Sequence, residues 1–136
     1  MALIGAKAHS ARLKRMTSPD AVERIGRGLF KAWLEIQTEA QRLITNGAVS
    51  GKNHVPSRPG EPPNEDTGTL RRNIETTQPE PLLVEVRSNA PYAVFLEVGT
   101  SKMAARPYMK PAVETKRKAV TEYIRAVVKK VISDGA

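Results

Sequence analysis

The sequence contains no cysteine, and its uninterrupted apolar runs are only a few residues long. The missing thiols exclude thiolate metal sites, thiol catalysis and disulfide scaffolds, and they fit a protein kept in a reducing cytosol. The short apolar runs exclude a membrane-spanning helix, which needs about 20 consecutive apolar residues. The chain has 136 residues, the length of one ordinary domain. We therefore predict a single domain over 1–136 that needs no disulfide or metal for stability.

Aromatic residues are scarce, although the chain is strongly basic. Three Tyr, two Phe and one Trp stand against a net charge of +8. A basic protein is attracted to nucleic acid or to acidic partners. Proteins that bind single strands interleave aromatic side chains with basic ones so that bases can stack, and that interleaving is missing here. A basic nucleic-acid-binding protein therefore stays as the alternative to the function developed below.

Catalytic patterns are missing as well. The two histidines, His9 and His54, lack the spacing of a metal-binding pair, and no glycine-rich phosphate loop follows a predicted strand. Ser101 does not stand in a nucleophile-elbow pattern. Glu65 and Asp66 are adjacent acids in a polar loop, where carboxylates are solvated. We therefore predict that the chain is not an enzyme, with no catalytic, cofactor-binding or metal-binding residue and no cofactor.

Helical periodicity dominates both ends of the chain. Residues 2–16 predict a short basic helix. Ser18 as a cap and Pro19 at the first helical position predict the start of a long helix that Asn46-Gly47 ends. Apolar residues recur along it at steps of three and four, namely Val22, Ile25, Leu29, Ala32, Ile36, Ala40 and Leu43.

A second long helix is predicted from Pro111 to Asp134-Gly135. Its apolar stripe consists of Val113, Val120, Ile124, Val127 and Val131.

The middle of the chain predicts a loop and then a hairpin. Residues 47–68 are rich in proline and polar residues and predict a long flexible loop. Two strands are predicted at 70–77 and 82–88, joined by a turn at 78–81. Residues 91–99 fit either a short helix or a strand. A hairpin between two long amphipathic helices predicts an α+β fold, a small antiparallel sheet packed with two long helices.

The segment 89–112 stands out because three prolines and one glycine interrupt it while apolar residues persist. We predict that Gly99 lets the chain reverse in a backbone conformation that other residues adopt poorly. We also predict a partly buried ion pair between Glu97 and Arg106, on either side of the turn. A well-packed connection between the sheet and the last helix explains the composition equally well.

Two motifs in this half of the chain belong together. The first is Pro56-Ser57-Arg58-Pro59-Gly60-Glu61-Pro62-Pro63, followed by Asp66-Thr67-Gly68-Thr69-Leu70-Arg71. The second combines Tyr92-Ala93, Glu97-Val98-Gly99-Thr100-Ser101, Arg106-Pro107-Tyr108 and Pro111-Ala112. In this order they resemble the tail-completion family of long-tailed phages named after the gene-ten product of the lambdoid phage HK-ninety-seven. Tyr108 is the least typical position, because Phe is common there in that family.

The resemblance implies a virion structural protein of the phage neck or upper tail, made in the host cytoplasm. Relatives form rings, often hexameric, that join or terminate the tail tube at the head connector. The implied partners are further copies of the chain and the neighbouring connector and tail-tube proteins, while DNA passes through the ring without specific binding. Neither a cofactor nor a membrane is implied. The motif residues implied as the interface are Pro59, Gly60, Pro62, Pro63, Thr67, Gly68, Leu70, Tyr92, Glu97, Gly99, Thr100, Arg106, Pro107 and Pro111.

The last helix carries a large share of the positive charge. Between 110 and 136 lie seven basic and three acidic residues, half of the net charge of +8. The most basic stretch is Lys116, Arg117 and Lys118, which we predict to face an acidic protein neighbour. A channel that bound DNA tightly would resist its passage, because each neutralised phosphate adds affinity. A solvated helix face is the simpler alternative.

Overall fold

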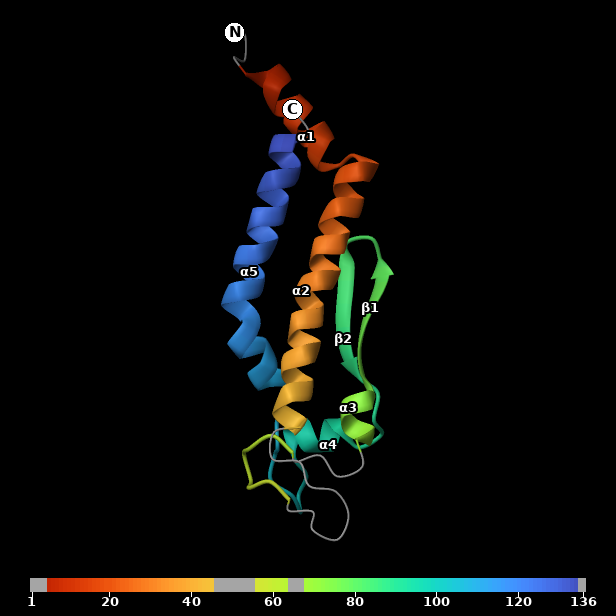
Figure 1. Ribbon diagram of the computed structural model, residues 1–136, viewed down its shortest axis with the longest axis vertical. Helices are drawn as coiled ribbons and strands as arrows, with labels where there is room; N and C mark the ends of the chain where they lie inside the picture. The colour runs from red at the N-terminus through yellow and green to blue at the C-terminus, as the bar shows by residue number, and fades with distance from the viewer. Residues whose placement is uncertain (1–4, 46–55, 64–67, 135–136) are drawn as a thin grey trace.

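The computed structural model describes residues 5–45, 56–63 and 68–134. The elements in chain order are α1 (Ala6–Met16), α2 (Pro19–Thr45), α3 (Thr69–Arg72), β1 (Ile74–Glu80), β2 (Leu83–Ser88), α4 (Ala93–Val98) and α5 (Met109–Asp134). The molecule is elongated, and α2 stands between α5 on one side and the hairpin of β1 and β2 on the other (Figure 1). This confirms the predicted α+β fold, in which a small antiparallel sheet packs with two long helices.

Helix α2 begins where the sequence predicts. The backbone N–H of Ala21 donates to Ser18 Oγ at 3.2 Å, so Ser18 caps the helix in front of Pro19. The predicted apolar face turns inward, and Ala32, Ile36 and Ala40 are buried in the core. The predicted end at Asn46-Gly47 lies outside the described residues.

The hairpin differs from the prediction at both ends of its first strand, β1. Residues 70–72 belong to α3, because Leu70 is buried in the core on a single helical turn that follows Gly68. Strand β1 continues through the predicted turn to Glu80, which pairs with Leu83, and its register shifts between Thr77 and Glu80. Pro79 is tolerated there because an edge strand need not donate every hydrogen bond.

Two glycines let α2 approach its neighbours on both sides. A Cβ placed on Gly26 would lie 2.2 Å from the carbonyl oxygen of Pro81 in the hairpin turn. Gln78 Nε2 joins the same place by donating to the carbonyl oxygens of Gly26 and Pro81 at 3.1 and 3.0 Å. A Cβ on Gly28 would lie 2.9 Å from a methyl carbon of Val127 on α5. The hairpin turn and α5 are therefore both seated directly on the α2 backbone.

Helix α5 covers the other side of α2. Val120 and Val131 of its predicted stripe are buried, and Val113, Ile124 and Val127 are half-buried. The helix starts at Met109, two residues before the predicted Pro111. Helix α1 projects beyond the end of α2 and α5 (Figure 1) and contains no buried residue. None of the described helices is long and apolar enough to cross a membrane.

One carboxylate is buried in α2. The side chain of Glu39 is only 7% exposed, and it accepts hydrogen bonds from Arg42 Nε and Nη2 at 3.0 and 2.6 Å. These hydrogen bonds, helped by the charges of Arg42 and Lys116, hold the pKa of Glu39 below its ordinary value, although burial acts in the opposite direction. Glu39 therefore stays ionised in the folded protein to a lower pH than in the unfolded chain.

The close approach of the hairpin turn at Gly26 predicts that a single added methyl group destabilises the protein. Gly26→Ala should lower the free energy of unfolding by about 1–3 kcal/mol, because the hairpin turn must move off the helix. This loss should exceed the gain of about 1 kcal/mol that alanine brings to a helix interior. Urea denaturation measures the difference, with the exposed Thr38→Ala as a control expected to change stability by under about 0.5 kcal/mol. A Gly26→Ala variant as stable as the wild type would contradict the close approach.

The lowered pKa of Glu39 predicts a pH dependence. A carboxyl whose pKa is lower in the folded state stabilises the protein at neutral pH, and this contribution is lost as the pH falls through the folded pKa. Between about pH 6 and pH 3 the wild type should therefore lose more unfolding free energy than Glu39→Gln. Urea titrations at several pH values measure both slopes, and the exposed Glu114→Gln should keep the wild-type slope. Equal slopes for the wild type and Glu39→Gln would refute the assignment.

Candidate functional site

The two sequence motifs meet at one end of the molecule. Helix α4, the turn 99–107 and the start of α5 lie together there, beside α3 and the described residues 56–63 (Figure 1). The backbone N–H of Gly60 donates to the carbonyl oxygen of Ala105 at 2.8 Å, which joins the first motif to the second. Pro63 is buried, whereas Pro59 and Gly60 are exposed. The fold thus brings together, at one surface, two motifs that are far apart in the sequence.

Two further residues of the first motif are described in the structure, and one is not. Pro62 is half-buried in the described part of the loop, and Gly68 precedes α3 with φ +78°. Thr67 lies outside the described residues, as do His54, Glu65 and Asp66.

Glu97 organises this end of the molecule by capping α5. Its Oε1 accepts hydrogen bonds from the backbone N–H groups of Tyr108 and Met109 at 3.2 and 2.9 Å, and its Oε2 accepts one from Lys110 at 3.3 Å. The first N–H groups of a helix have no partner within the helix, and a carboxylate there also faces the positive end of the helix dipole. This explains why α5 begins at Met109 and not at the predicted Pro111.

The predicted ion pair between Glu97 and Arg106 is wrong. The ion pairs within 4.0 Å among the described residues do not include it. The carboxylate of Glu97 is committed to the helix start, while Arg106 is held through its backbone N–H, which donates to the carbonyl oxygen of Leu96 at 2.6 Å. Arg106 Nε is buried without a hydrogen-bond partner among the described residues.

The turn after α4 confirms the prediction for Gly99, which has φ +79° and ψ 175°. Only glycine adopts this region readily. A Cβ at this position would also lie 2.8 Å from the backbone nitrogen of Ala105. Thr100 closes the turn, because its N–H donates to the carbonyl oxygen of Met103 at 2.8 Å and its Oγ1 accepts from the N–H of Met103 at 3.1 Å.

Tyr108 anchors the start of α5 to the hairpin. It is 1% exposed, and its hydroxyl lies 2.6 Å from Ser88 Oγ at the end of β2. Burial raises the pKa of this phenol, against the effect of the hydrogen bond with Ser88. The hydroxyl partner gives a structural reason for a tyrosine at this position. Pro107 and Pro111 on either side are half-buried.

The outer side of α4 exposes a group of large apolar side chains that sequence reasoning missed, apart from Tyr92. We call the four residues Tyr92, Val94, Phe95 and Val98 the α4 surface; they are 42%, 66%, 53% and 69% exposed. The helix is short and apolar on nearly all sides, while only Ala93 is buried. A helix that is apolar all round is normally covered on all sides, and this pattern could have indicated an interface. Exposed apolar patches on a folded protein mark sites of interaction.

The predicted charged stretch lies elsewhere, on α5. Lys116 Nζ is 3.9 Å from Glu35 Oε2 on α2, while Arg117 and Lys118 are exposed. The structure therefore does not join these residues to the motif surface. His9 is exposed on α1, and the described residues contain no group of three or more His, Cys, Asp or Glu side chains placed to hold a metal ion.

The exposed apolar α4 surface is the feature of this end that is typical of a site of interaction with another molecule. The family model described as "Bacteriophage HK97-gp10, putative tail-component" matches residues 7–99 of the chain. The chain therefore belongs to the HK97 gp10-like family of bacteriophage tail components, which confirms the resemblance inferred from the motifs. Neither the curated proteins nor the solved structures include a match. The matched residues include α4 and its apolar surface.

Removing the carboxylate of Glu97 should weaken the start of α5. We expect Glu97→Ala to lower the free energy of unfolding by about 1–2 kcal/mol, as the loss of a helix cap does. Urea denaturation measures this change, and the exposed Glu114→Ala on the same helix should cost under about 0.5 kcal/mol. Adding Arg106→Ala should give an additive effect, because the two side chains share no bond. Strong coupling in the double variant would instead support the ion pair.

Proposed function

We propose that this chain is a structural protein of the phage neck or upper tail that forms a ring and joins or terminates the tail tube at the head connector. The ring is a homo-oligomer, with six copies as the expected number, in which the 136 residues form one domain. DNA passes through the ring without specific binding. The protein acts in the virion, after synthesis in the host cytoplasm, and it catalyses no reaction.

The α4 surface is the observation that carries this proposal. Its apolar side chains stand on a short helix whose position is set by the Glu97 cap and the Gly99 turn, so little ordering is needed on binding. A preorganised surface binds with less loss of conformational freedom than a mobile one. We assign this surface to the contact with a neighbouring connector or tail-tube protein, because membership of a tail-component family implies such neighbours.

The basic helices support a second candidate, a nucleic-acid-binding protein. Helix α1 carries Lys7, Arg12, Lys14 and Arg15 without any acid, and α5 adds a further basic excess. Binding that depends on these residues would weaken steeply with salt, because counterion release dominates it. Tight duplex binding at physiological salt, without any association with tail proteins, would favour this candidate over the neck protein.

Polar replacement on the α4 surface tests the proposal. The double variant Phe95→Ser and Val98→Ser should fold normally, because both side chains are exposed, and should lose most of its capacity to join heads to tails. Central aromatic residues of an interface commonly contribute about 2 kcal/mol or more, which corresponds to roughly thirty-fold weaker binding. The measurement adds purified protein to a phage lysate that lacks the chain and counts joined particles by electron microscopy.

The exposed Leu34→Ser on α2 serves as the matched control, and it should support joining like the wild type. Circular dichroism of each variant separates a folding defect from a binding defect. If the double variant joined heads to tails at the wild-type level, the α4 surface would have no role in the contact.

A further inference from the structure

A groove runs between α2 and α5. Two neighbouring pockets of about 240 and 260 Å³ share Lys31 and Tyr123, so they form one continuous depression, which we call the α2–α5 groove. Its floor is apolar and includes Ala32, Ala119 and Val120. None of the described residues of the chain fills this groove.

The rim of this groove is basic. Five basic side chains and one acidic side chain line it. Arg24 and Arg27 form ion pairs with carboxylates of the same molecule, and Lys116 lies near Glu35. Lys31 and Lys130 take part in no ion pair among the described residues. The groove therefore fits an apolar projection that carries acidic groups.

The hairpin of the same chain has that chemistry. Leu82 and Leu83 at its tip are 52% and 42% exposed, and the exposed Glu80 stands beside them, opposite Leu83 in the strand register. The hairpin residues 74–88 include three acids and one base. The turn is also held firmly against Gly26 by Gln78, so the tip is presented in a fixed position.

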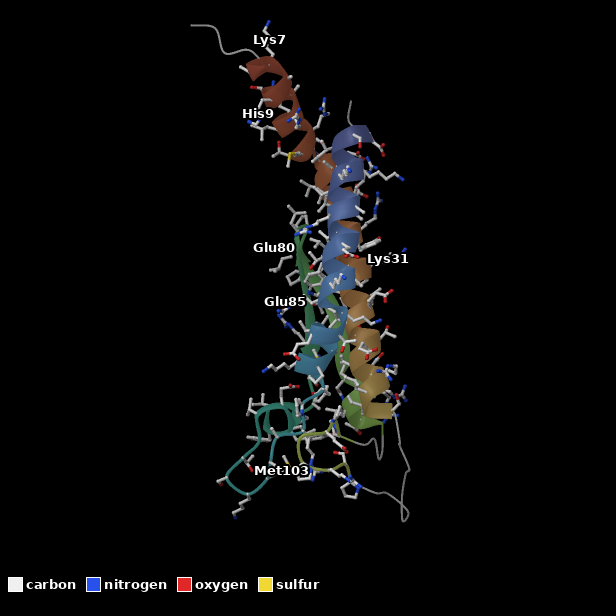
Figure 2. All side chains as sticks on the ribbon, turned by 90° about the vertical axis from the view of Figure 1, so that its left-hand side faces the viewer. Lys7, His9, Lys31, Glu80, Glu85 and Met103 are labelled. Atoms are coloured by element: carbon white, nitrogen blue, oxygen red, sulfur yellow. The ribbon has the colours of Figure 1, made fainter. Side chains whose placement is uncertain are left out.

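The hairpin and the groove lie on opposite sides of the molecule. Figure 2 shows Glu80 and Glu85 on one side of the helix pair and Lys31 on the other. We propose that the hairpin tip of one copy inserts its leucines into the α2–α5 groove of the next copy, with Glu80 near Lys31. Two different surfaces on opposite sides make a head-to-tail contact, which closes into a ring when the rotation between copies permits it. This inference rests on the ring proposed above and names the surfaces that build it.

A cysteine pair tests the contact directly, because the natural chain has no cysteine. Leu83→Cys combined with Ala119→Cys should form disulfides between copies under mild oxidation. Such a bond needs Cα atoms within about 7 Å, and within one molecule α2 lies between the hairpin and α5 (Figure 1). Non-reducing electrophoresis should show a ladder that ends at the number of copies in the ring. The matched control, Leu83→Cys with the exposed Thr121→Cys outside the groove, should give no ladder.

Charge reversal tests the same contact without cysteine. Glu80→Lys and Lys31→Glu should each weaken self-association roughly tenfold, since like charges then face each other. An equimolar mixture of these two variants should associate again, because opposite charges meet at every contact of an alternating ring. Sedimentation analysis measures both effects, with Glu122→Lys on the exposed face of α5 as the control.

The results of these two experiments distinguish the proposed contact between copies from the proposed function in the phage neck. No ladder, either in concentrated protein or in assembled particles, or an equal ladder in the Thr121 control, overturns the contact. If Glu80→Lys fails to self-associate and also fails to join heads to tails, while the mixture restores both, the contact and the ring are supported. A ladder from a chain that is absent from purified phage particles supports the contact and overturns the neck function.

Discussion

The contact between the Glu97 carboxylate and the first turn of α5 determines the shape of the motif end. One side chain from α4 accepts hydrogen bonds from three backbone N–H groups, those of the first two residues of α5 and of Tyr108 just before it. The two helices therefore cannot separate without exposing unpaired donors. The turn between them must then fit a fixed span, which accounts for the positive φ of Gly99 and the closed loop at Thr100. Tyr108 transmits the same constraint to the hairpin through Ser88.

Helix α2 positions the hairpin and α5 along the long axis of the molecule. It contacts the hairpin on one side and α5 on the other, and glycines at 26 and 28 allow both to approach its backbone. A protein with one central helix and a thin layer on each side buries little of its outer surface. Both the α4 surface and the α2–α5 groove therefore remain open, and an assembly can use them without rearranging the core.

The distribution of charge fits the proposed contact between the hairpin tip and the α2–α5 groove. Glu80 and Glu85 of the hairpin lie on one side of the helix pair, and Lys31 on the rim of the groove lies on the other (Figure 2). In the proposed contact between copies, long-range attraction of this kind orients two copies before they touch and disfavours the reversed arrangement. The leucines at the hairpin tip then supply the short-range contacts with the apolar floor of the groove. We therefore propose that electrostatics selects the orientation of the copies and that apolar burial stabilises it.

Local sequence patterns determined the long helices, the cap at Ser18, the unusual backbone at Gly99 and the family, because each depends on residues close together in the chain. Only the tertiary structure decided the partner of Glu97: the sequence offers Arg106 nearby, but the unpaired N–H groups at the start of α5 come within reach of the carboxylate only once α4 and α5 meet. The sequence favours a strand for residues 70–72, whereas the structure places them in the helical turn α3, in which Leu70 is buried in the core. The exposure of Phe95 and Val98 was equally hidden, since apolar residues of a short helix look alike in sequence whether or not anything covers them.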